Sequence, residues 1–161
     1  MSGYLKRGLL AGVAAAFLIA GTAVSVPAQS PGEVIKDRRA LMKDNSANMK
    51  KVKAFLKGKA GTAADIAAAG NRLAANAARI AALYPKGTSA EDGVGKTRAK
   101  PAIWLKRADF ETAATAMKTA GAKLAAAAGS GDMAAIKVAA GAMGKSCGGC
   151  HKPFRAPKKK K

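Results

Sequence analysis

The residues of this chain with the clearest chemistry are five consecutive ones near its C-terminus, Cys-Gly-Gly-Cys-His at 147–151. Cys-x-x-Cys-His is the attachment pattern for a c-type haem. On a helix, Cys147 and Cys150 occupy neighbouring positions of one face, and each thiol can add to one vinyl group of the porphyrin. His151 follows on the same face, where its ring can reach the iron as the proximal ligand. The motif therefore predicts one covalent haem c, held by two thioether bonds and bound at the iron by His151.

Other uses of the same residues stay open at this point. A thioredoxin-like redox motif needs Cys-x-x-Cys at the start of a helix that follows a strand, whereas this motif ends a helical pattern. A zinc site would need ligands from a second chain, because two Cys and one His cannot supply four. A structural disulfide between Cys147 and Cys150 is the third alternative. An enzyme of the Ser-His-Asp or Cys-His type would have to use His151, the single histidine.

The chain is strongly basic. Its 161 residues include 29 Lys or Arg and 9 Asp or Glu, which gives a net charge of +20. Such a balance favours nucleic acid, acidic proteins or an anionic membrane as partners. We expect no nucleic-acid binding, because no motif for it is visible and aromatic residues, which stack on bases, make up only 4%. We expect acidic redox proteins as partners, while the lysine tail at 158–161 could also contact anionic lipid. A plain solvated surface is the alternative.

The first 28 residues have the pattern of a secretory signal peptide. Lys6 and Arg7 precede a long apolar run, and Val-Pro-Ala at 26–28 offers a cleavage site. A membrane anchor is the alternative, although the apolar run is slightly short of the ~20 residues that a spanning helix needs. We expect residues 1–28 to be removed on export to the periplasm. A single domain over 29–161 then remains, and its charge is +18 because only two basic residues are lost.

The remaining sequence predicts helix throughout. Ala, Leu, Lys and Met, all good helix formers, are abundant, and Pro and Gly fall at the joints. Ser30, Pro31 and Glu33 form a capping signature at the start of one helix, and Thr62 with Asp65 marks another. The expected helices cover residues 31–57, 63–84, 101–128 and 132–152, with a polar loop at 85–100.

Apolar residues recur about every seven positions within each expected helix, which is typical of packed helices. Four amphipathic helices with two short connections favour an all-α fold, an antiparallel four-helix bundle. The rows are rich in Ala, so the core is thin and would gain from a large apolar guest near the C-terminal helix. The rows are Ile35, Met42, Met49 and Leu56; Ile66, Leu73 and Ile80; Ile103, Phe110, Met117 and Leu124; and Met133, Ile136, Ala140, Met143 and Cys147.

The layout resembles the class II c-type cytochromes, cytochrome c′ and its relatives. These are exported four-helix bundles with Cys-x-x-Cys-His near the C-terminus. The resemblance covers nearly the whole exported sequence, and its most specific piece is residues 144–151. It implies one haem c per chain and no enzymatic activity, and it suggests a homodimer, since relatives often pair through their first two helices. The other matching pieces are residues 34–38, 41–43, 103–104 and 154–155.

In this family the function depends on which residue lies on the second, distal face of the haem iron. By resemblance Met42 occupies that distal position, four residues after Arg38. In the low-spin branch a methionine there ligates the iron and the protein carries electrons. The segment 41–49 looks like that branch, so we expect His151 and Met42 as axial ligands of an electron carrier. The alternative is a five-coordinate, high-spin protein that binds nitric oxide or carbon monoxide, with Met42 only packing on the haem.

Two arginines are expected near the haem, also by resemblance. Arg38 would lie close to a haem propionate, where a guanidinium can pair with a carboxylate. Arg155, four residues after His151, would border the proximal pocket. Each could instead be a solvated surface side chain. Pro153 is expected to end the last helix, which leaves the course of Phe154 and Arg155 open.

Overall fold

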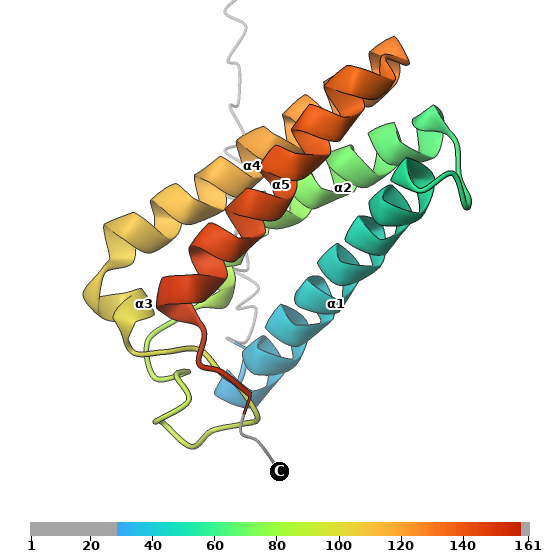
Figure 1. The fold of residues 1–161 in the computed structure, drawn as a ribbon. Coiled ribbons are helices and arrows are strands. Elements are labelled where there is room, and N and C mark those ends of the chain that lie inside the picture. Colours follow the sequence, from blue (N-terminus) through green and yellow to red (C-terminus); the bar gives the residue numbers. More distant parts are fainter. Residues whose placement is uncertain (1–28, 159–161) are drawn as a thin grey trace, which may run out of the picture.

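The protein is an all-α four-helix bundle over residues 29–158, the part of the chain that the structure, a computed structural model, describes (Figure 1). The predicted fold class is confirmed. The expected signal peptide at 1–28 and the last three residues of the lysine tail lie outside the described residues. The elements are α1 (Pro31–Leu56), α2 (Ala63–Ile80), the 3₁₀ helix η1 (Ala81–Leu83), α3 (Ala102–Leu105), α4 (Arg107–Ser130) and α5 (Met133–Phe154).

Both expected capping signatures are present. Ser30 Oγ accepts a hydrogen bond from the backbone N–H of Glu33 at 3.3 Å, and the Glu33 carboxylate accepts one from the backbone N–H of Ser30 at 2.8 Å. Thr62 and Asp65 repeat the arrangement at the start of α2, at 3.2 and 2.8 Å. Each pair satisfies backbone donors that the first helical turn leaves free. Local sequence therefore fixes where α1 and α2 begin.

Helices α2 and α4 approach closely through two glycines. A Cβ added to Gly70 would lie 2.6 Å from the backbone nitrogen of Ala125, and one added to Gly121 would lie 2.8 Å from that of Ala74. No side chain larger than hydrogen fits at either position without moving a backbone. This contact makes α2 and α4 a closely packed pair.

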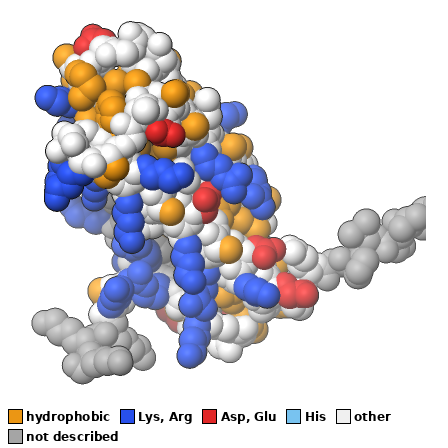
Figure 2. Space-filling view, turned by 90° about the vertical axis from the view of Figure 1, so that its right-hand side faces the viewer, with side chains coloured by type: hydrophobic (Ala, Val, Ile, Leu, Met, Phe, Trp, Pro, Cys, Tyr) orange, Lys and Arg blue, Asp and Glu red, His pale blue; other side chains and the backbone are white. Residues whose placement is uncertain are grey.

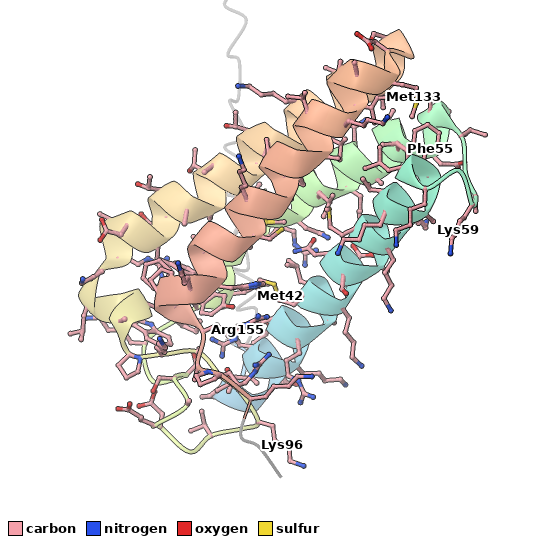
Figure 3. The ribbon with its side chains drawn as sticks, viewed as in Figure 1. Met42, Phe55, Lys59, Lys96, Met133 and Arg155 are labelled. Carbon is pink, nitrogen blue, oxygen red and sulfur yellow. The ribbon has the colours of Figure 1, made fainter. Side chains whose placement is uncertain are left out.

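The core fills the space beside this pair with apolar side chains of α2, α4 and α5. Leu73, Leu124, Ile136 and Met143 have no solvent exposure. The expectation that Met133 belongs to this core is wrong: it is 42% exposed, because it lies at the tip of α5 beyond the packed region (Figure 3). Within residues 29–158, none of the helices combines the length and apolar character needed to cross a bilayer.

Helices α1 and α5 pack on different neighbours. Helix α1 packs against α2 and η1, whereas α5 packs against α4. The side of the bundle between α1 and α5 is therefore less tightly closed. The loop that follows η1 and the segment after α5 lie together at one end of the bundle (Figure 1), where Lys100 N–H donates to the Phe154 carbonyl at 3.1 Å and Ala156 N–H to the Arg98 carbonyl at 2.8 Å.

The third helix, expected as one piece over 101–128, is divided at Lys106. This residue has φ −121° and ψ 53°, which is outside helical geometry. The break lets Trp104 Nε1 and Arg107 Nη1 both donate to the carbonyl of Tyr84, each at 3.1 Å. The apolar row continues across the break, so the sequence pattern predicts one helix where tertiary hydrogen bonds make two.

Helix α5 runs through Pro153 and ends at Phe154, two residues later than expected. Pro153 has no N–H, so the last turn lacks one backbone hydrogen bond. Burial of the Phe154 ring, which is 5% exposed, and the bond from Lys100 to its carbonyl hold the last turn in place. Arg155 then leaves the helix and forms an isolated antiparallel bridge with Ala99.

Candidate haem site

A cavity of about 860 Å³ opens between α1 and α5. This volume lies within the ~300–1,000 Å³ typical of small-molecule and cofactor sites. The structure thus brings most of the predicted site residues around one space, while Cys147 lies one turn back on α5 and packs against the core. Five of the six predicted residues line the cavity: Arg38, Met42, Cys150, His151 and Arg155.

The Cys-x-x-Cys-His residues occupy the last two turns of α5, half-buried. Burial raises the pKa of both thiols, Cys147 and Cys150. Burial also lowers the pKa of His151, and the positive charges of Arg155 and Arg98 lower it further. At neutral pH the imidazole is therefore uncharged, and one ring nitrogen keeps the lone pair that a metal ligand requires.

Arg38 provides the test of whether the cavity suits a haem. Its side chain is 3% exposed, donates through Nη2 to the Thr88 carbonyl at 2.9 Å, and lies 4.3 Å from the centre of the Tyr84 ring. Its Nε and Nη1 are buried and find no hydrogen-bond partner among the described residues. Buried donors without partners are costly, and the propionates of a haem are carboxylates of the kind that would satisfy them. The cavity, the thiols, the imidazole and this unpaired cation together fit a covalently attached haem.

Met42 lies on α1 across the cavity from α5. Figure 3 shows its side chain in the space between the two helices, with Arg155 near the end of α5. The side chain is half-buried, and its sulfur accepts a hydrogen bond from Asn45 Nδ2 at 3.9 Å. Met49, two turns along α1, also packs against the core cluster, as its place in the apolar row predicts, but it is not among the residues that line the cavity.

The cavity has a basic rim. Among the described residues that line it, none is acidic. Figure 2 shows Lys and Arg side chains distributed over one face of the molecule, with few acidic groups between them. The rim consists of Arg155 with five further cations, Arg39, Lys43, Lys96, Arg98 and Lys158.

Sequence reasoning missed Tyr84 and Asn76. The Tyr84 ring lines the cavity and covers Arg38, and burial raises its pKa. Asn76 is 2% exposed and hydrogen-bonds to Asn45 across the α1–α2 contact. The available signals were a rare aromatic residue before Pro85 and one amide within the apolar face of the second helix.

The alternatives left open by the motif gain no support. Cys147 and Cys150 are not joined in a disulfide. The motif lies at the end of a helix, and within residues 29–158 the only β pairing is the Ala99–Arg155 bridge. No group of three or more His, Cys, Asp or Glu that could hold a metal ion occurs in the described part of the chain.

Comparisons of the chain with known proteins and structures find similarity to one protein family. The family model described as Cytochrome C′ matches residues 33–155. A cytochrome c′ of Allochromatium vinosum is 38% identical over 153 residues, covering 93% of this chain and 99% of the relative. A cytochrome c-554 of Cereibacter sphaeroides is 34% identical over 143 residues, covering 86% and 90%. The crystal structure of cytochrome c′ from Thermochromatium tepidum superposes with a TM-score of 0.73 at 39% identity, covering 80% of this chain and 98% of that one.

The match covers more than two thirds of both this chain and its relatives, and it includes the whole Cys-x-x-Cys-His segment. The cofactor expectation is confirmed at the level of the family. The chain belongs to the cytochrome c′ family, non-enzymatic proteins that carry one covalent haem c per chain.

Proposed function

We propose that this protein is a periplasmic electron carrier with a six-coordinate, low-spin haem c. Cys147 and Cys150 would hold the haem through thioethers, and His151 and Met42 would bind its iron. The observation that carries this proposal is that Met42 and His151 line one cavity from two different helices, α1 and α5. A bound haem supplies one-electron chemistry, and His/Met ligation raises its potential by favouring the ferrous state.

The chain's own residues would contribute ligation and burial. The half-buried imidazole of His151 is uncharged at neutral pH, which leaves a nitrogen free to bind metal. The thioether of Met42 is a soft ligand fixed to a long, capped helix. Because both ligands come from preformed helices, little of the protein needs to move when an electron arrives or leaves.

Arg38 would pair with a haem propionate. Its two unpartnered donors are buried beside the cavity that the haem would fill. A buried guanidinium next to a buried carboxylate forms a strong, charge-assisted hydrogen bond. Arg155 is exposed on the rim and would border the proximal side, close to His151.

The basic rim would guide acidic redox proteins to the opening of the cavity. Complementary charge accelerates encounter, and the acceleration weakens as salt is added. The periplasmic location rests on the signal-peptide pattern of residues 1–28, and covalent attachment of haem on the exported side of the membrane agrees with it.

A second candidate function, binding of nitric oxide or carbon monoxide to five-coordinate iron, has the more direct support from relatives. The relatives include several proteins named cytochrome c′. One similar structure, 29% identical with a TM-score of 0.69, is the nitric oxide complex of a mutant cytochrome c prime from Alcaligenes xylosoxidans; it covers 80% of this chain and 98% of that one. In this alternative Met42 would cover the distal face of the haem without ligating it.

The spin state of the oxidised holoprotein decides between the two functions. The electron-carrier proposal requires a low-spin spectrum that Met42→Ala converts to high-spin. Met49→Ala is the matched control, since Met49 is also half-buried on α1 and packs on the core but is not among the residues that line the cavity. A high-spin wild-type spectrum, unchanged by Met42→Ala and accompanied by rapid tight nitric oxide binding, would establish the second function instead.

A homodimer is also proposed. One similar structure is described as a cytochrome c′ with ligand-controlled dimer dissociation. Sedimentation of the holoprotein at rising concentration, with and without carbon monoxide, measures both the dimer and its dependence on the ligand. A single species of monomer mass throughout would contradict the proposal.

A further inference from the structure

We propose that Asn45 is a positioning residue for Met42, and that a line of polar side chains between α1 and α2 holds Asn45 in its orientation. The inference rests on the proposed placement of Met42 at the distal face of the haem. It concerns how the thioether sulfur is aimed, which the axial-ligand assignment leaves open.

The first observation is a buried amide beside the sulfur. Asn45 is 7% exposed and follows Met42 by three residues, so the two side chains are neighbours on one face of α1. Its Nδ2 lies 3.9 Å from Met42 Sδ, at the long end of the range for a hydrogen bond to sulfur. A thioether is a weak acceptor, and its sulfur has two lone pairs. With one directed at the Asn45 amide, the other can be directed at a metal.

The second observation fixes which way the amide points. Asn76 of α2, 2% exposed, donates through Nδ2 to Asn45 Oδ1 at 2.8 Å. A flipped Asn45 would place an NH₂ group against this donor. The Asn45 oxygen must therefore face α2, and its NH₂ group must face Met42.

The third observation extends the line to the surface. Asn76 Nδ2 also donates to Asp44 Oδ2 at 2.6 Å, and Arg72 Nε donates to the same oxygen at 2.7 Å. The carboxylate can only accept, so it dictates that the nitrogen of Asn76 faces α1. The side-chain amides of Asn76 and Asn45 can then each adopt only one of their two flipped orientations. Such networks define side-chain orientation more strongly than isolated pairs.

The chain offers a matched control in Asn48. It is 7% exposed, lies one turn further along α1, and donates through Nδ2 to the Asp44 carbonyl at 2.9 Å. Its Nδ2 also makes a long contact of 3.4 Å with Oδ1 of the Asp44 carboxylate, whereas Asn76 and Arg72 bond to Oδ2, and it makes no hydrogen bond to Met42. Asn48→Leu therefore removes a buried amide from the same helix without touching the sulfur.

The test compares Asn45→Leu, Asn76→Leu and Asn48→Leu as full-length holoproteins. In Asn45→Leu we expect the equilibrium constant for Met42 ligation to the ferric iron to fall about three- to tenfold, as for the loss of one neutral hydrogen bond. The low-spin fraction falls with it. Because weaker ligation of the ferric iron destabilises the oxidised form, the reduction potential rises by up to about 59 mV, the one-electron equivalent of a tenfold change. Asn76→Leu should shift both quantities in the same direction by less, and Asn48→Leu, whose contact with the Asp44 carboxylate is the long one, should shift them least.

A second readout separates this proposal from the proposed function. Methionine labelled with ¹³C at its methyl group reports the position of Met42 whether or not the sulfur binds iron. We expect one Met42 methyl signal in the wild type, and a shifted or multiple signal in Asn45→Leu. If Asn45→Leu leaves that signal unchanged, the positioning role is overturned. If the wild type is high-spin but the signal still moves, Met42 ligation fails while the positioning role stands.

Discussion

Arg38 on α1 lies over the ring of Tyr84, with its guanidinium carbon 4.3 Å from the ring centre. Nη2 is bonded to the Thr88 carbonyl at 2.9 Å, while Nε and Nη1 face no partner among the described residues. The contact places a cation beside the cavity between α1 and α5. A positive charge held in place in this way is suited to receive a carboxylate.

We expect Arg38→Leu to lower the free energy of unfolding of the holoprotein by about 2 kcal/mol more than that of the apoprotein. Hydrogen bonds to charged groups contribute about 1.5–3 kcal/mol, and the propionate would be present only in the holoprotein. Urea unfolding of both forms measures the difference. Arg38→Lys keeps the charge but not the planar guanidinium, so its extra loss of unfolding free energy in the holoprotein should lie between zero and that of Arg38→Leu. Equal costs in the two forms would contradict a propionate contact.

The two thioethers make a separate prediction. Cys147→Ala and Cys150→Ala should each leave the haem attached through the remaining cysteine, and the double variant should release all haem into acidified organic solvent. The measurement is the mass of the intact protein after such extraction, from a host competent in haem attachment. Ser146→Ala, beside Cys147 on α5, is the control and should keep both bonds. Haem retained by the double variant would rule out the attachment proposed here.

The close contact of α2 with α4 predicts a strong effect from one methyl group. Gly70→Ala places a Cβ 2.6 Å from the Ala125 nitrogen, and forced overpacking typically costs about 1–3 kcal/mol. Gly141→Ala is the control: it lies within α5, is exposed and would meet nothing within 4 Å. It should stabilise the protein by about 0.5–1 kcal/mol, the usual gain over glycine inside a helix. The free energy of unfolding of each variant tests both the expected loss for Gly70→Ala and the expected gain for Gly141→Ala.

The basic rim predicts salt-dependent reaction with anionic redox partners. The double variant with Lys43→Glu and Lys96→Glu should be oxidised by hexacyanoferrate(III) about tenfold more slowly than wild type at low salt. Electrostatic steering changes association rates by about tenfold or more. The difference should disappear at high salt. Lys118→Glu with Lys123→Glu, a charge reversal of equal size on α4, is the control. An equal effect of the two pairs would show that net charge, and not the rim, governs the rate.

The capping box of α2 predicts a pH dependence of stability. The hydrogen bonds from the Thr62 side chain and backbone lower the pKa of Asp65. Its contribution is therefore present above the unfolded-state pKa of about 3.9 and is lost as the pH falls through the lower folded pKa. Asp65→Asn should be less stable than wild type at neutral pH, and the gap should narrow at a pH below both pKa values. Urea unfolding at the two pH values measures this, and a constant gap would contradict it.

Most of the fold could be predicted from local patterns in the sequence. The capping residues Ser30 and Thr62 mark the starts of α1 and α2, because the hydrogen bonds they make span only three residues. The apolar rows predicted four helices for the same reason: helical spacing is a local property. The division at Lys106 and the passage of α5 through Pro153 could not be predicted, because both depend on contacts with residues distant in the sequence.

The same distinction applies to the site. The haem-attachment motif of Cys147, Cys150 and His151 could be predicted from the sequence, since three or four residues of chain set the spacing of these side chains on one helix. Only the tertiary structure decided that Met42 and Arg38 share a cavity with His151, and that Asn76 reaches Asn45. These pairings join α1 to α5 and to α2. They depend on how whole helices pack, and no spacing within one helix can encode that.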